Sequence, residues 1–453
     1  MLARLQRLLT YLRASLWFVP ALMVLGAVII ALSLIEADSR LNREMLAEWP
    51  RLFGASAEGA RNILSAIAGS MITVAGVTFS LTIVALSLAS NQYTPRILRN
   101  FMRDRGNQVV LGIFVSVFIY CLVVLRTIRG GEEAFVPSLS VVFAIALAVV
   151  SIGFLIYFIH HIATSIQASS ITASVAEETI RAITFLFPQR VGDEPDQAAP
   201  YHREIELEDK SWLVVPAPAT GYIQSVDPDA LVKFAEKHKT VLRMERGVGE
   251  FIIQGSPLAS LMLEGELEPN LIRDVSDIYA INEYRTVEQD AGFGIRQLVD
   301  IALKALSPGV NDTTTALTCV DYLGAILHCL AGRRIPPRYR YSQGKLSVIA
   351  RGPTFDSLVN EAFHEIRQNA GGNVAVILRM LQTIMSVASQ TENEFRRRAL
   401  RQHVELLLET TNRSVSSVHD RLVINRCITH VTHALGRRDP EQLSAPVGKN
   451  NSV

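Results

Sequence analysis

The chain has 453 residues, enough for about three domains at the usual 100–200 residues each. It is 49% hydrophobic and only 19% charged, with a net charge of +1. Charged residues are scarcest in the first third of the chain. Residues 1–164 carry 13 Lys+Arg and 8 Asp+Glu, whereas residues 165–453 carry 31 and 35. This composition excludes a disordered chain, a disulfide scaffold and a uniformly soluble enzyme. It does not favour a nucleic-acid binder, because no domain is strongly basic.

Four stretches lack charged side chains and are long enough to cross a bilayer, which needs about 20 apolar residues. They cover residues 16–35, 63–90, 107–125 and 138–159. Soluble core helices are rarely so long and so free of charge, so residues 1–164 are predicted to form a four-span helical transmembrane domain. The first run is too long for a signal peptide and no small-residue cleavage site follows it, so we expect it to be retained.

Arginine and lysine near the span ends indicate the orientation. The N-terminal segment holds Arg4, Arg7 and Arg13 without an acid, and the loop 91–106 holds four arginines. These are the densest positive segments, and both are expected on the cytoplasmic side. The sequence therefore predicts a multi-pass protein of the bacterial inner membrane, with its N-terminus and its large C-terminal region in the cytoplasm.

The second predicted span carries small and hydroxylated side chains on one face. At about 100° per residue, seven of them fall within about 80° of arc. These seven, called the stripe below, are Ser65, Gly69, Thr73, Gly76, Ser80, Ser87 and Asn91. Small residues allow close helix packing in membranes, and hydroxyls with exposed glycine carbonyls could instead line a wet path. No span contains Asp, Glu, Lys or Arg, which argues against a proton relay or a charge-coupled pump.

The remainder is predicted to be an α+β region. The fourth span is expected to continue as one helix to Phe187, where Pro188 stops it, and a polar linker completes residues 165–210. Residues 211–265 read as a small β-rich module and residues 266–436 as a mostly helical domain. Within it, a hairpin is expected around Gly344, and three amphipathic helices are expected from Phe355 onward. The tail 437–453 is expected to be disordered.

One turn in the helical domain is a candidate anion or ligand site. Ser307 and Gly309 end one predicted helix, and Asn311 or Asp312 caps the next, which continues with Thr313. A helix N-terminus attracts anions, and Arg296 and Lys304 lie one helix away. A simple capped turn explains the same residues. Gly292 and Gly294 are not a dinucleotide fingerprint, because the third glycine and the preceding strand are missing.

Other polar groups suggest no chemistry. His160 and His161 point about 100° apart on a helix and are expected to lie at the membrane surface rather than to bind a metal. Arg396, Arg397, Arg398 and Arg401 form a basic patch, expected to be solvated, with contact to anionic lipid or a neighbouring subunit as the alternative. The four cysteines form no C-x-x-C motif, and no nucleophile–base pair appears. We therefore expect no cofactor, no metal and no enzymatic activity.

Several long blocks in order resemble one family. They read "SLWFVPAL", "AGSMITVAGVTFSLTIVALSLASNQYTPRILRNFMRDRGNQVVLG", "HHIATSIQ" and "KALSPGVNDTTTA". Together they are similar to the bacterial predicted membrane proteins of domain-of-unknown-function family 2254, over most of the chain. The resemblance implies a bacterial inner-membrane protein with four N-terminal spans, and it transfers no functional residues.

Two hypotheses follow from the sequence. The first is a homo-oligomeric, channel-like protein for ions or small solutes, in which the stripe lines or packs the central axis and the cytoplasmic region gates or assembles it. The second is a membrane-anchored sensor or scaffold that reads a small anion or ligand at the turn 307–315. In both, the lipid bilayer is a partner and nucleic acid is not.

Overall fold

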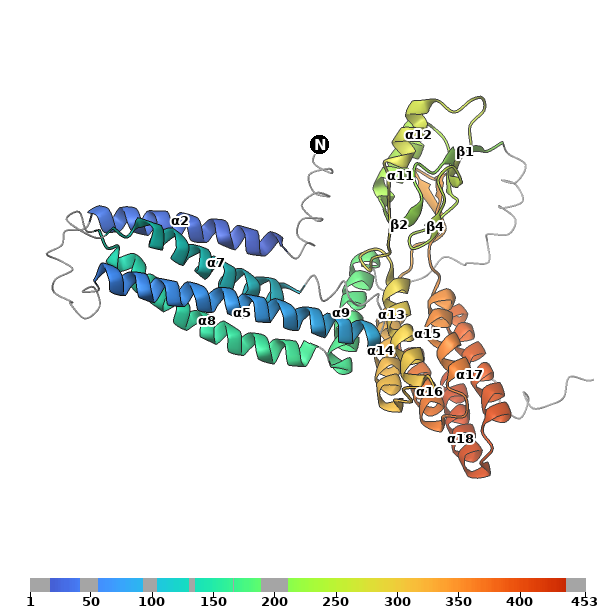
Figure 1. Cartoon of the computed structure of the whole chain (residues 1–453). Coiled ribbons are helices and arrows are strands. Elements are labelled where there is room, and N and C mark those ends of the chain that lie inside the picture. The colour runs from blue at the N-terminus through green and yellow to red at the C-terminus, as the bar shows by residue number, and fades with distance from the viewer. Residues whose placement is uncertain are drawn as a thin grey trace, which may run out of the picture. The chain divides into compact units, whose positions relative to one another are not determined.

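The computed structural model describes residues 17–40, 56–92, 104–129, 135–165, 167–188 and 211–436, without the side chains of residues 89–92. Within these ranges the chain forms two compact units, residues 1–170 and 171–453 (Figure 1). The predicted linker before Ser211 and the tail after Gly436 lie outside the described residues.

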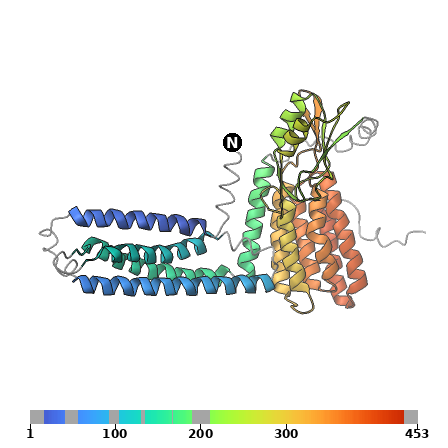
Figure 2. The ribbon, with the colours of Figure 1, turned by 45° about the horizontal axis from the view of Figure 1, so that its top comes forward.

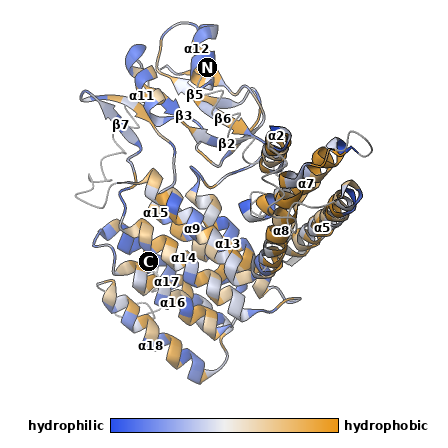
Figure 3. Cartoon of the chain, turned by 90° about the vertical axis from the view of Figure 1, so that its left-hand side faces the viewer, coloured by the Kyte–Doolittle hydropathy of each residue, from blue (hydrophilic) through white to orange (hydrophobic). Residues whose placement is uncertain are grey.

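The described residues of unit 1 form four long helices that run side by side (Figures 1 and 2). Their bounds are α2 Phe18–Arg40, α5 Ala57–Gln92, α7 Arg105–Thr127 and α8 Ser138–Ser165. Each covers most or all of one predicted apolar run and extends beyond it at one end or both. Helix α7 contacts the other three, and its Val110, Phe114, Tyr120 and Val124 are almost fully buried. Figure 3 shows these helices as predominantly hydrophobic.

The fourth helix does not continue to Phe187 as expected. Helix α8 ends at Ser165, and a separate helix, α9 (Ala168–Leu186), begins after Gln167. The apolar spacing that suggested one helix belongs to two helices with different surroundings. Ile171, Val175 and Ile183 of α9 are buried, and Thr179 between them meets Gly294 of helix α13 in unit 2.

Unit 2 contains two small sheets. The strands are β1 Leu213–Pro216, β2 Gly221–Val226, β3 Leu242–Met244, β4 Phe251–Ile252, β5 Pro257–Leu261, β6 Tyr279–Asn282, β7 Tyr339–Ser342 and β8 Lys345–Ile349. One sheet has the order β1-β5-β3-β8-β7 and the other β4-β2-β6. Helices α11 (Pro228–Lys237) and α12 (Pro269–Ser276) belong to the same part of unit 2.

The β-part is therefore larger than the predicted module of residues 211–265. Strand β6 pairs with β2, and β8 pairs in parallel with β3, bringing Val348 opposite Leu242. Both β6 and β8 come from the region predicted to be mostly helical. The hairpin expected around Gly344 is present, and Gln343 and Gly344 both adopt positive φ, as in a type I′ turn.

Six helices complete unit 2. They are α13 Ala291–Leu306, α14 Thr313–Ala331, α15 Phe355–Asn369, α16 Val374–Ala388, α17 Glu394–Ser414 and α18 Val418–Ala434. Each begins with a side-chain cap, from Asp290, Asp312, Thr354, Asn373, Asn393 and Ser417 in that order. From Phe355 onward the described chain forms four helices where three were predicted, because Ser417 caps a new helix after Ser414.

Five described helices are long and apolar enough to cross a membrane: the four of unit 1 and α14. Helix α14 packs against α13 and α16, and it buries Cys319, Leu323 and Leu327 completely. Its close contact with α16 depends on Gly324, where an added Cβ would lie 2.5 Å from Cγ2 of Thr383. Burial among neighbouring helices is therefore sufficient to explain the apolar composition of α14.

Candidate functional site: the uncovered face of α5

The stripe lies on the face of α5 that points away from the rest of unit 1. The opposite face is buried against α7 and α8 through Leu64, Ala68, Met71 and Ala75. At about 100° per residue the centre of these four positions is about 130° from the centre of the stripe. The stripe residues from Ser65 to Ser87 are all exposed, and the side chain of Asn91 lies outside the described part of the chain.

Nothing in the described part of the chain covers the stripe glycines. A Cβ added at Gly69 or Gly76 would meet no atom within 4 Å. The other described helices of unit 1 therefore do not pack closely against the stripe glycines. The Thr73 hydroxyl donates to the carbonyl of Gly69 at 2.8 Å, so its donor is satisfied while its oxygen can still accept a hydrogen bond.

The uncovered faces of the other helices have a different composition. Helix α2 exposes Leu22, Leu25 and Ile29, and α8 exposes Val149, Ile152 and Ile156. These are the large apolar side chains expected against acyl chains. Exposed large residues also flank the stripe on α5, for example Ile72, Val77 and Phe79. The stripe is thus a narrow band of small and hydroxylated residues, interrupted by the exposed Ile83, on a surface that is otherwise lipid-like.

A groove beside α5 offers no polar path within one chain. It lies between α5, α7 and α8, has a volume of about 380 Å³, and is lined mainly by apolar side chains. Its two hydroxyl groups, of Ser70 and Ser151, donate to carbonyls of their own helices at 2.8 Å.

A buried carboxylate joins α2 to the start of α8. Asp38 is only 8% exposed and accepts hydrogen bonds from the backbone N–H groups of Leu139 and Ser140, at 2.9 and 3.0 Å. The Ser140 hydroxyl also donates to Asp38, at 2.7 Å. The negative charge thus lies at the positive end of the α8 dipole. Sequence reasoning missed this contact, because the partners are about a hundred residues apart.

A second polar contact lies at the other end of unit 1. Asp104 caps α7 by accepting from the N–H of Gly106, and its other oxygen lies 2.6 Å from Nε2 of His161 on α8. The ring of Tyr157 stacks on His161. His161 is thus held by a carboxylate, whereas His160 is exposed. Among the described residues no group of three His, Cys, Asp or Glu side chains could hold a metal.

The predicted anion turn is occupied by its own carboxylate. Asp312 accepts from the backbone N–H of Thr315 at 3.0 Å and from its hydroxyl at 2.6 Å. These hydrogen bonds lower the pKa of Asp312. Asn311 adopts a φ of 48° before the cap, and Lys304 and Gly309 are exposed. The N-terminus of α14 therefore already holds a negative charge.

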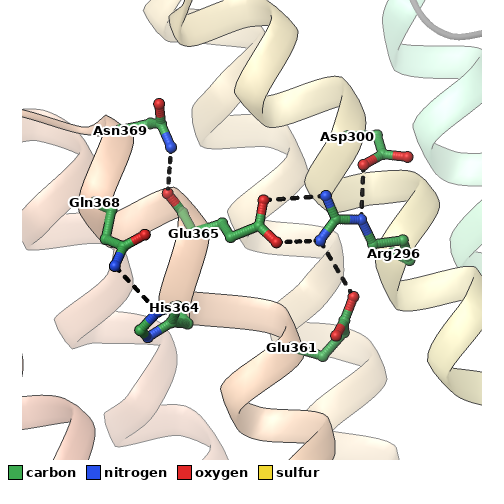
Figure 4. Close-up of polar contacts among 7 residues, drawn as sticks. All are labelled: Arg296, Asp300, Glu361, His364, Glu365, Gln368 and Asn369. Carbon is green, nitrogen blue, oxygen red and sulfur yellow. Dashed lines mark hydrogen bonds and ion pairs between the residues drawn. The ribbon is translucent and has the colours of Figure 1, made fainter.

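Arg296, predicted to assist that turn, binds carboxylates instead (Figure 4). Its guanidinium forms a bidentate pair with Glu365 and also contacts Asp300 at 2.8 Å and Glu361 at 3.5 Å. The hydrogen bonds from Arg296 lower the pKa of Glu365. This cluster joins α13 to α15. The structure thus places Arg296 against three acids, so this cation does not assist the turn 307–315. Anion binding at the turn stays a prediction.

The basic patch of α17 also has a structural role. Arg396 is 4% exposed and donates to the carbonyls of Ala331 and Arg333, at the end of α14 and beyond it, at 2.8 and 2.9 Å. Arg401 donates to the carbonyl of Leu435 at the end of α18. Cations near the last carbonyls of a helix stabilise it. The expected solvated face is wrong for Arg396, and Arg398 remains exposed.

Comparison with known proteins decides the family. The model of a family described as "Predicted membrane protein (DUF2254)" matches residues 13–386. The chain belongs to this family. Uncharacterized proteins of Mycobacterium tuberculosis (MT1328) and Mycobacterium bovis (Mb1321c) are similar to it, at 32% identity over 98% of this chain and 85% of theirs. No solved structure matches.

Membership confirms the resemblance found in the sequence and fits the apolar helices of unit 1. It identifies a membrane protein and assigns no activity. The match begins at residue 13, before α2, and ends within α16, so the matched region includes all four helices of unit 1 and both sheets of unit 2.

Proposed function

We propose that the protein is a channel-like component of the bacterial inner membrane that acts as a homo-oligomer. Helices α2, α5, α7 and α8 are the four spans, with the N-terminus and unit 2 in the cytoplasm. In the oligomer the stripes of neighbouring α5 helices face one another around a central axis. An ion or a small solute passes along this axis.

The observation that carries this proposal is the uncovered stripe. Small residues on a membrane helix allow a second helix to approach closely, and glycine leaves backbone carbonyls accessible to a permeant species. A monomer would present Ser65, Thr73 and Ser80 to acyl chains beside faces built from leucine, isoleucine and valine. A second copy of the same helix removes this mismatch. Two-fold and higher rotational symmetry are the usual routes to such assemblies.

Unit 2 suits a gating or assembly role better than ligand reading. Its candidate turn is filled by Asp312, and Arg296 is held by Glu365, so no observation favours the sensor over the channel. Helix α9 follows the fourth span after Ser165 and packs on α13. A movement of α13 and the helices packed on it would therefore displace α9 and, through it, the end of α8.

Conductance of the purified protein in planar bilayers tests the proposal. We expect wild type to conduct. Gly76→Leu should lower the conductance at least about ten-fold, because the leucine side chain would project into the path along the central axis. The subunit itself should tolerate the change, since the Cβ position is open. Gly153→Leu on α8 is the matched control, because its Cβ would also meet nothing within 4 Å. A silent wild type, or equal conductance in both variants, contradicts the channel.

A further inference from the structure

The part of unit 2 around the β7–β8 hairpin is strongly basic. Residues 333–351 contain six Lys or Arg and no acid, although residues 165–453 as a whole carry 31 basic and 35 acidic side chains. The cations of the hairpin and those of the neighbouring helix α11 and its end form what we call the basic face. Its members are Lys233, Lys237, Lys239, Arg338, Arg340 and Lys345.

The two elements of the basic face are held together. Helix α11 contacts β8, and the Ser342 hydroxyl at the hairpin turn donates to Glu236 of α11. Lys233 and Lys237 flank Glu236 on the exposed side of that helix. Figure 3 shows α11 and β7 beside each other at one edge of the β-part. The face is thus built on a sheet and a capped helix rather than on a loose tail.

Helix α11 also carries Asp229 and Glu236, but four lysines of the basic face form no ion pair among the described residues. Lys233, Lys237, Lys239 and Lys345 are exposed and have no ion-pair partner in the described part of the chain. An anionic surface would relieve this excess of positive charge.

We propose that the basic face docks on anionic phospholipid headgroups of the leaflet that unit 2 faces. The chain belongs to a family of predicted membrane proteins, and clustered Lys and Arg are attracted to anionic lipid. Tyr341 at the hairpin is 47% exposed, and it suits the membrane interface, where aromatic rings with a polar end accumulate.

The experiment uses full-length protein in which the four cysteines are replaced and Gln343→Cys carries an environment-sensitive fluorophore. Gln343 already has a φ of 48°, so another non-glycine residue adds little strain. The protein is reconstituted in vesicles of phosphatidylcholine, with or without phosphatidylglycerol, that contain a headgroup-attached quencher. We expect about two-fold stronger quenching with phosphatidylglycerol, and we expect about 0.5 M salt to abolish the difference because it screens surface charge.

Variants separate docking from a general charge effect. Lys237→Glu with Lys345→Glu should abolish the lipid dependence. Lys304→Glu with Arg398→Glu changes two exposed cations outside the face by the same charge and should preserve it. Equal quenching in both lipids, or equal loss in the two double variants, overturns the proposal. The proposal is also overturned if phosphatidylglycerol has no effect while an oligonucleotide, added to neutral vesicles, changes the fluorescence. That result would mean that the face binds nucleic acid rather than lipid.

Discussion

Replacing Asp38 with alanine should destabilise unit 1 by about 3 kcal/mol. The carboxylate accepts two backbone N–H groups and one hydroxyl at the start of α8, and a buried hydrogen bond to a charged group contributes about 1.5–3 kcal/mol. The loss is smaller than the sum of the three bonds, because water can reach the end of a membrane helix. Helix-cap removal alone costs about 1 kcal/mol.

Thermal unfolding of the full chain in detergent, followed by loss of the monodisperse species, measures this effect. Glu36→Ala is the matched control, since Glu36 lies on the same helix and its side chain pairs with Arg40 on an exposed surface. Asp38→Asn keeps one acceptor oxygen and should fall between the two. If Asp38→Ala and Glu36→Ala unfold at the same temperature, the contact does not hold α2 to α8.

Gly294→Ala should destabilise unit 2 by about 2 kcal/mol, because α9 and α13 touch at this glycine. The new Cβ would overlap Oγ1 of Thr179 and lie 2.9 Å from its Cβ. Overpacking costs about 1–3 kcal/mol and sometimes more, and the better helix propensity of alanine returns at most about 1 kcal/mol. Thr179 is β-branched and donates to the carbonyl of Val175, so it cannot easily move away.

A double-mutant cycle tests this contact. Thr179→Ala removes the closest atom, so Gly294→Ala should cost much less in that background, though not nothing, since the two Cβ atoms would still be 2.9 Å apart. Gly292→Ala on the same helix is the control, because its nearest neighbour would be 3.3 Å away. Additive losses from Gly294→Ala and Thr179→Ala would mean that the helices do not meet here.

The sequence was sufficient for the membrane part, where the signal is local. A long run without charged residues identifies a membrane helix without any knowledge of tertiary contacts. The four apolar runs accordingly lie within or largely within α2, α5, α7 and α8. Side-chain caps were equally readable where an acceptor precedes an apolar run, as at Asp312. Helix ends were less predictable, because the apolar period continues through the break between Ser165 and Ala168.

Long-range pairing explains most of what the sequence could not provide. Nothing near Leu242 reveals that its parallel partner is Val348, and nothing near Asp38 reveals Ser140. Charge was misleading for the same reason. The sequence pattern placed Arg296 near an anion site and Arg396 on a solvated face. In the fold, Arg296 binds Glu365 and Arg396 donates to carbonyls at the end of α14.

The sequence identified the residues of the stripe, and the structure showed that this face of α5 is uncovered. Periodicity grouped Thr73 and Ser80 on one face of a helix without showing what that face meets. The structure shows that the stripe points away from Leu64 and Ala75, two of the residues that α5 buries within unit 1. The proposed path along the stripe therefore requires a second copy of the chain.

Disulfide cross-linking along α5 tests that dependence most directly. Single cysteines are placed in a cysteine-free background at Thr73, Gly76 and Ser80 on the stripe and, as controls, at Val77 on α5 and Val149 on α8. We predict covalent dimers in native membranes at the stripe positions and few at Val77 and Val149, which face lipid. Dimers at the control positions with none on the stripe would contradict an assembly built around this face of α5.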